Sequence, residues 1–92
     1  MNTTPNGYRE CVVTAIKRSD DKVIIKTEET ASGTHTFDFI CSKEYAQHEG
    51  ILSLVVGNIV LFKYKNPMDD KKTKFESDFE DIVFTHYVIA KQ

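Results

Sequence analysis

Apolar and polar side chains alternate along much of the chain, and this period of two predicts β-strands. The alternation is clearest in residues 22–28, where β-branched side chains share one face and charged side chains the other. Residues 35–41 repeat the pattern with two phenylalanines on one face. Residues 8–17 carry apolar side chains at both parities, which predicts a strand buried on both faces along part of its length. The three strands are expected to form a meander, with a polar turn at residues 18–21.

The middle of the chain predicts one short helix followed by a fourth strand. Ser42 is a suitable N-cap, Glu44 lies where the helix dipole favours an acid, and Gly50 can take the left-handed conformation that ends a helix. A helix is therefore expected over residues 43–49. Residues 59–64 then form an apolar run after a Gly-Asn turn, which predicts the fourth strand.

The last third of the chain contains one ambiguous segment and one strand. In residues 66–80 the phenylalanine positions fit both helical spacing and strand alternation, so we expect a long, partly ordered connection. Residues 82–90 are apolar at both parities and rich in β-formers, which predicts a central strand or one covered by a partner. Residues 1–7 are expected to be a flexible lead-in to a single domain over residues 8–92.

The predicted order is strand, strand, strand, helix, strand, strand, and the segment Val56-Gly57-Asn58-Ile59-Val60 leads into the fourth strand. This order resembles the OB-fold, a five-stranded Greek-key barrel, and the segment is similar to the Val-Gly-Asp-x-Val entry into the fourth strand of many OB barrels. The resemblance covers roughly residues 8–90. It implies a mainly β chain, a β-rich α+β domain built as a five-stranded OB-like barrel with the helix between strands three and four.

Composition fits one small globular domain. The chain has 92 residues, of which 40% are hydrophobic and 28% charged, enough for one modest core without metal or disulfide. The residues expected in that core are Val13, Val23, Ile25, Phe37, Phe39, Leu52, Leu61, Phe84 and Val88. Cys11 and Cys41 lie in apolar runs without zinc-site spacing, so we expect buried free thiols, although neighbouring strands could pair them. No apolar stretch is long enough to span a bilayer, which predicts a cytoplasmic protein without membrane contact.

The residue types that carry catalysis do not group along this sequence. His35, His48 and His86 stand apart, and no P-loop, nucleophile elbow or zinc-hydrolase motif is present. We therefore expect no catalytic residues, no metal and no cofactor, and a protein that works by binding. The formal charge of −2 comes from 12 basic and 14 acidic residues spread along the chain, so composition alone provides no strong field for a polyanion.

One candidate binding surface follows from the resemblance. OB barrels that bind single-stranded nucleic acid use basic and aromatic residues on strands two and three and on the adjoining loops. Side chains of these types occur at the corresponding places, with the lysines expected to line one side of the barrel and contact phosphates and the aromatic rings to stack on bases. They are Lys26, Lys63, Tyr64, Lys65, Lys71, Lys72, Lys74 and Phe75. Single-stranded DNA or RNA is then the expected partner.

A second candidate surface is the acidic stretch that follows the lysines. Glu76, Asp78 and Glu80 could dock on a basic protein partner, with Phe79 as an apolar anchor. The alternative interpretation is a solubilising loop whose phenylalanines cover the end of the barrel. The doubly apolar last strand also predicts pairing through an exposed strand edge, most simply in a homodimer. A protein partner and nucleic acid both remain open at this point.

Overall fold

The computed structural model describes residues 7–31, 35–76 and 79–87. The predicted lead-in before Gly7 and the end of the predicted last strand, from Val88 onward, lie outside these ranges. The described elements are β1 (Arg9–Arg18), β2 (Lys22–Glu29), β3 (Thr36–Ser42), α1 (Lys43–His48), the 3₁₀ turn η1 (Ile51–Ser53), β4 (Ile59–Tyr64), the 3₁₀ turn η2 (Pro67–Asp69), β5 (Lys74–Phe75) and β6 (Ile82–Tyr87). The chain is mainly β, as predicted.

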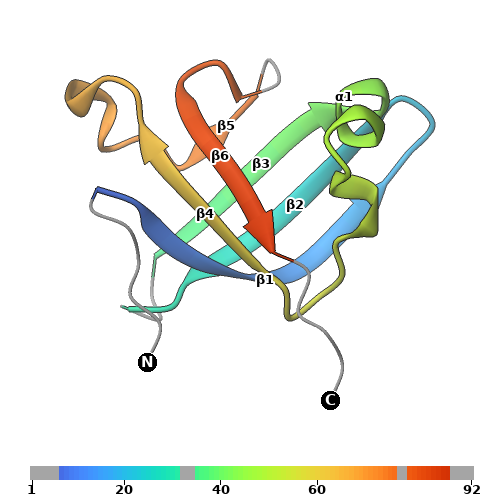
Figure 1. The fold of residues 1–92 in the computed structure, drawn as a ribbon, viewed down its shortest axis with the longest axis horizontal. Coiled ribbons are helices and arrows are strands. Elements are labelled where there is room, and N and C mark those ends of the chain that lie inside the picture. Colours follow the sequence, from blue (N-terminus) through green and yellow to red (C-terminus); the bar gives the residue numbers. More distant parts are fainter. Residues whose placement is uncertain (1–6, 32–34, 77–78, 88–92) are drawn as a thin grey trace.

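The six strands form one strongly curled sheet in the order β5-β3-β2-β1-β4-β6 (Figure 1). All neighbours are antiparallel except β3 and β5, which run parallel. β1 is strongly curved (Figure 1), and it pairs with β2 through residues 11–18 and with β4 through residues 9–12. Within the described part of the chain, no ladder joins β6 to β3 or β5, so the sheet is a half-barrel. The sequence prediction of five strands lacked the two-residue strand β5.

A β-bulge accounts for part of the apolar pattern at both parities of β1. Cys11 and Val13 are buried in the core, but the register with β2 shifts between Val13 and Ala15. The extra residue in such a bulge reverses the inward parity of the strand, and Ile16 therefore packs against the core instead of Ala15. The bulge thus accounts for Ala15 and Ile16, while Val12, which precedes it on the outer parity, is half-buried.

The prediction of a central last strand is wrong for the described residues, because β6 lies at an edge of the sheet and pairs only with β4. Its inner face carries Ile82, which is buried, and Phe84, which packs against the core. Val83 points the other way and is 38% exposed. The apolar side chains of β6 therefore lie on both of its faces, of which one is buried in the core and the other is open in this chain.

The capping residues in the sequence predicted the position of the helix to within one residue. The Ser42 hydroxyl accepts a hydrogen bond from the Tyr45 amide at 3.1 Å, as an N-cap does. Gly50 has a φ of 72°, the left-handed conformation that follows many helices. The helix ends at His48, one residue earlier than predicted. The connection expected to be partly ordered contains η2 and β5.

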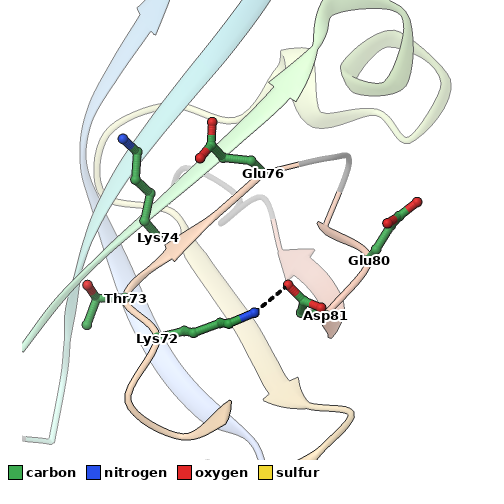
Figure 2. Close-up of a pocket in the computed structure, with 6 residues that line it drawn as sticks. All are labelled: Lys72, Thr73, Lys74, Glu76, Glu80 and Asp81. Atoms are coloured by element: carbon green, nitrogen blue, oxygen red, sulfur yellow. Dashed lines mark hydrogen bonds and ion pairs between the residues drawn. The ribbon is translucent and has the colours of Figure 1, made fainter.

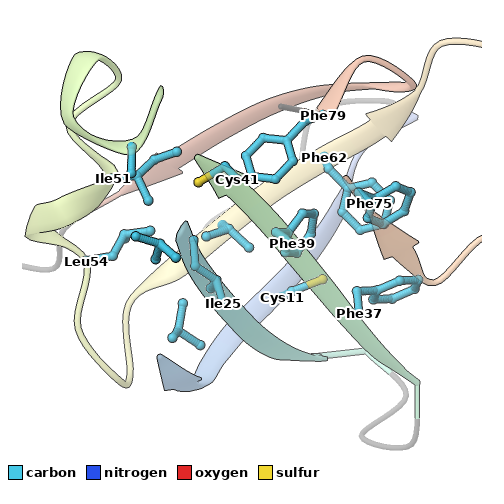
Figure 3. Close-up of a cluster of buried hydrophobic side chains, with 14 of the residues drawn as sticks. Cys11, Ile25, Phe37, Phe39, Cys41, Ile51, Leu54, Phe62, Phe75 and Phe79 are labelled. Carbon is cyan, nitrogen blue, oxygen red and sulfur yellow. The ribbon is translucent and has the colours of Figure 1, made fainter. Parts of the chain in front are cut away.

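The core is aromatic at one end and aliphatic at the other. Figure 3 shows the phenylalanine rings gathered at one end of the half-barrel and Ile25, Ile51 and Leu54 at the end near the helix. The residues predicted in the core and found buried are Val13, Val23, Ile25, Phe37, Phe39 and Leu61. Leu52 and Phe84 are partly buried against the core. Leu61 does not belong to the core cluster, since Val60 and Phe62 on either side of it point inward. Cys11 and Cys41 are buried and form no disulfide with each other.

Candidate functional site

The opening between β3 and β6 is filled by aromatic rings instead of backbone hydrogen bonds. The ring of Phe39, on β3, lies 5.0 Å from that of Phe84, on β6, between centroids. Phe79 completes the contact, with its ring 5.7 Å from Phe39 and 4.9 Å from Phe84. Offset and edge-on ring pairs at these distances are favourable. We call this opening, bounded by β3, β6 and residues 79–81, the seam.

Phe79 holds its place in the seam with a strained backbone. Its φ is 64°, and it is the one non-glycine residue in the described ranges with a positive φ. A bulky side chain rarely adopts this conformation, which costs about 1–2 kcal/mol for an L-residue. The ring is nevertheless 3% exposed, and the amide donates to the Glu76 carbonyl at 2.9 Å. Burial of the ring therefore offsets the strain of the turn.

This strain can be measured by comparing two truncations of the same residue. The free energy of unfolding of Phe79→Gly is expected to equal that of Phe79→Ala or to exceed it by up to about 1 kcal/mol. The reason is that glycine adopts a positive φ without steric cost. Within β6, where no such strain exists, Phe84→Ala should instead be more stable than Phe84→Gly by about 0.5–1 kcal/mol. Urea denaturation of the four variants tests the reversal. The same order at both positions would show that Phe79 is unstrained.

A charged pocket of about 390 Å³ lies beside the seam. Figure 2 shows its lining, which is made by Lys72, Thr73, Lys74, Glu76, Glu80 and Asp81. The Lys72 ammonium donates to the Asp81 carboxylate at 3.0 Å, and this hydrogen bond raises the pKa of Lys72. Three carboxylates against two ammonium groups give the lining a net negative charge. Asp81 immediately precedes β6, so this charge lies at the start of the edge strand.

The lysines predicted to line one side of the barrel are distributed over several parts of it. Lys26 and Lys74 flank Asp38 in the register of β2, β3 and β5, and the Lys26 ammonium lies 3.5 Å from the Asp38 carboxylate. Lys63 is on the outer face of β4, and β1 separates β4 from β2 in the sheet. The Lys63 ammonium lies 5.3 Å from the centre of the Tyr8 ring. The remaining lysines lie in the connection after β4 and are exposed. They are Lys65, Lys71 and Lys72.

The predicted aromatic contacts change with the structure. Phe75 is 1% exposed and Phe79 is 3% exposed, so neither ring has a free face for a base or for a partner surface in this conformation. Both rings were expected at a binding surface, and both belong to the core, Phe75 from the inward-facing position of β5 and Phe79 from the turn before β6. Tyr64 is half-buried, its hydroxyl donates to the Lys72 carbonyl at 2.6 Å, and burial raises its pKa. Asp78 lies outside the described residues.

Sequence reasoning missed a second polar site, at the end of β2. The Glu29 carboxylate is largely buried and lies 3.3 Å from the Arg9 guanidinium and 3.2 Å from the His35 ring nitrogen Nδ1. Arg9 also lies over the rings of Phe37 and Tyr64, 5.9 and 5.7 Å from their centres. A pocket of about 440 Å³ opens here. The signal was available, because Glu29 continues the inward parity of β2 and a carboxylate there needs a partner.

Within the described residues, no group of three histidine, cysteine, aspartate or glutamate side chains could hold a metal ion. None of the described helices has the length and apolar character needed to cross a membrane. Comparison with protein-family models and with curated proteins gives no match. Fold and site together define a small half-barrel domain with a net-negative pocket at the start of its edge strand.

Proposed function

We propose that the protein is a non-catalytic binding module that holds a protein partner along the free edge of β6. The observation that carries the proposal is the position of β6, the last strand of an open sheet, directly after the acidic residues Glu80 and Asp81. An edge strand can accept an added strand through its unpaired backbone groups. The acidic charge beside it favours a partner segment that is basic.

The distribution of charges and rings also supports a protein partner over a nucleic acid. A single-strand groove needs rings on which bases can stack, and Phe75 is buried while Tyr64 is hydrogen-bonded to the loop backbone. Two of the lysines that would contact phosphates already lie against carboxylates, Lys26 at Asp38 and Lys72 at Asp81. These pairs reduce the positive field that a phosphate backbone would meet.

Single-stranded nucleic acid is the second candidate ligand. This candidate follows if the half-barrel is assigned to the OB-fold. The favourable observation is the group of exposed lysines in the connection after β4, where Lys71 lines the same pocket as Arg9. In this case Lys65 and Lys71 would contact phosphates. A homodimer is a special form of the first candidate, in which β6 of a second copy takes the free edge.

Two probes separate the candidates. One is a labelled peptide of alternating lysine and valine, and the other is a labelled single-stranded oligonucleotide. We expect the wild-type protein to bind the peptide, and Glu76→Lys with Glu80→Lys to weaken that binding by about tenfold through charge repulsion. The matched control carries Lys65→Glu with Lys71→Glu and should bind the peptide at least as well as the wild type. Fluorescence anisotropy at two salt concentrations gives the affinities.

The contrary result is equally specific. If nucleic acid is the ligand, the wild type binds the oligonucleotide with a steep salt dependence, and each lost phosphate contact reduces the log-log salt slope by about 0.7. The lysine variant would then lose binding, and the peptide would not bind. Light scattering that gives a mass well above 10.5 kDa for the wild type would point to the homodimer.

A further inference from the structure

One strained side chain closes the seam, and it is carried by the acidic segment next to the proposed docking edge. Phe79 contacts rings from three elements: Phe39 on β3, Tyr45 on α1 at 5.3 Å and Phe84 on β6. These three rings form the walls of what we call the aromatic slot. No strand of the described structure includes Phe79, which lies in the turn immediately before β6.

We infer that Phe79 is a displaceable plug, and that the aromatic slot takes a phenylalanine or tyrosine side chain from an extended, basic segment of a protein partner. The inference rests on the proposed function, because it identifies the chemistry of the segment that would lie along β6. In the bound state the partner's ring replaces that of Phe79 between Phe39, Tyr45 and Phe84. Its backbone adds to β6 as a further strand.

The backbone of Phe79 explains why the exchange is favourable. In the free protein the ring reaches the slot only with a φ of 64°, a conformation that bulky residues rarely adopt. A ring carried by an extended partner strand enters the slot without this strain, and the loop relaxes when Phe79 leaves. Strain held at one residue by the packing around it is typical of segments that change conformation on binding.

The surroundings of the slot specify the rest of the partner segment. Glu76 and Glu80 stand on either side of Phe79 in the sequence, and Asp81 leads into β6. Basic side chains two residues apart on a strand would lie on the face turned to these carboxylates. Asp81 already accepts from Lys72, so the added attraction comes from Glu76 and Glu80. An apolar segment would bring no cation to these two carboxylates, and an acidic segment would be repelled by them. The slot therefore favours an aromatic anchor flanked by lysine or arginine.

One ring nitrogen of His86, on the same face of β6 as Phe84, has no hydrogen-bond partner among the described residues. The Nε2 atom of His86 lies 3.1 Å from the Glu49 carbonyl, so it carries the proton in the neutral ring. The Nδ1 atom is then an acceptor, and it is buried with no hydrogen-bond partner among the described residues. Buried acceptors are normally satisfied. An N–H group of an added segment is the kind of donor this atom lacks.

The test uses two peptides that differ at one position: Lys-Val-Lys-Phe-Lys-Val-Lys and the same sequence with alanine in place of phenylalanine. Each is titrated into the wild type and into Phe79→Ala, in which the slot is empty. The Phe peptide is expected to bind Phe79→Ala about 10- to 100-fold more tightly than the Ala peptide does, because one ring is buried. In the wild type the difference should be several-fold smaller, since Phe79 competes for the slot.

Changes in the chemical shifts of the β6 amides in ¹⁵N NMR spectra distinguish docking on the β6 edge from entry of a partner ring into the aromatic slot. If both peptides shift β6 amides but Phe79→Ala binds them equally, the slot inference fails and docking on the β6 edge stands. If neither peptide shifts β6 amides in either protein, both fail. Should Phe79→Ala not fold, Phe79→Leu replaces it, and discrimination no greater than in the wild type would overturn the inference. Self-association of the folded variant without peptide would replace the basic partner with a second copy.

Discussion

Replacing Phe39 with alanine is expected to lower the free energy of unfolding by about 3–5 kcal/mol, the largest loss we predict for a single substitution. Phe39 is fully buried, and its ring contacts those of Phe62, Phe75, Phe79 and Phe84. It therefore supports the aromatic end of the core from β3 and also forms one wall of the seam. Its removal leaves a cavity that rings on four other segments would have to fill.

The loss at Phe39 is large relative to the total stability of a domain of this size, which is about 5–15 kcal/mol. Urea denaturation followed by circular dichroism measures it, and Phe39→Leu provides a milder variant if the alanine protein does not fold. Val55→Ala is the matched control, because Val55 is 56% exposed and its truncation should change stability by about 0.5 kcal/mol or less. Equal losses at the two positions would show that the ring cluster is not the core.

The local pattern of the sequence was enough to predict most of the sheet. In β2 and β3 strict alternation places Val23, Ile25, Phe37 and Phe39 in the core, as observed. Alternation depends only on the geometry of a single strand. The pattern in β1 was misread beyond Val13, because a bulge reverses parity without any distinctive residue at Thr14. Strand parity is therefore predictable only as far as the next irregularity.

The features that make up the candidate site depend on tertiary contacts and were less accessible. Phe75 and Phe79 lie among charged residues in a loop, where their sequence context is that of exposed rings. Their burial follows from the opening between β3 and β6, which no local pattern encodes. The position of β6 at an edge likewise depends on which strands pair. By contrast, the pairing of Glu29 with Arg9 was signalled by the inward parity of a carboxylate.

Alkaline pH is expected to destabilise the fold through the buried thiol of Cys11. Burial raises the pKa of this thiol from 9.0 to about 11, although its hydrogen bond with Thr27 acts in the opposite direction. In the unfolded chain the thiol ionises near its ordinary pKa, whereas in the folded protein it keeps its proton until about pH 11. The unfolded state therefore gains stability as the pH rises from 9 to 11, and the folded state does not.

The loss of stability caused by Cys11 is complete only above the pKa of its thiol in the folded protein, and it is absent below pH 9. The gap between the two pKa values corresponds to about 3 kcal/mol at order of magnitude. The raised pKa values of Tyr64 and Lys72 act with the same sign, because each of these groups also holds its proton more tightly in the folded protein. Stability should thus be level up to about pH 9 and then fall steeply.

Cys11→Ala separates the thiol from the other two groups. The variant is expected to be less stable than the wild type at pH 8, because a buried sulfur is lost. Between pH 9 and 11, however, its free energy of unfolding should decline less than that of the wild type, by about 3 kcal/mol. Urea titrations at several pH values, in the presence of a reductant, give the two curves. Parallel curves would mean that Cys11 ionises as readily in the folded chain as in the unfolded one, and that its burial in the core is not maintained in solution.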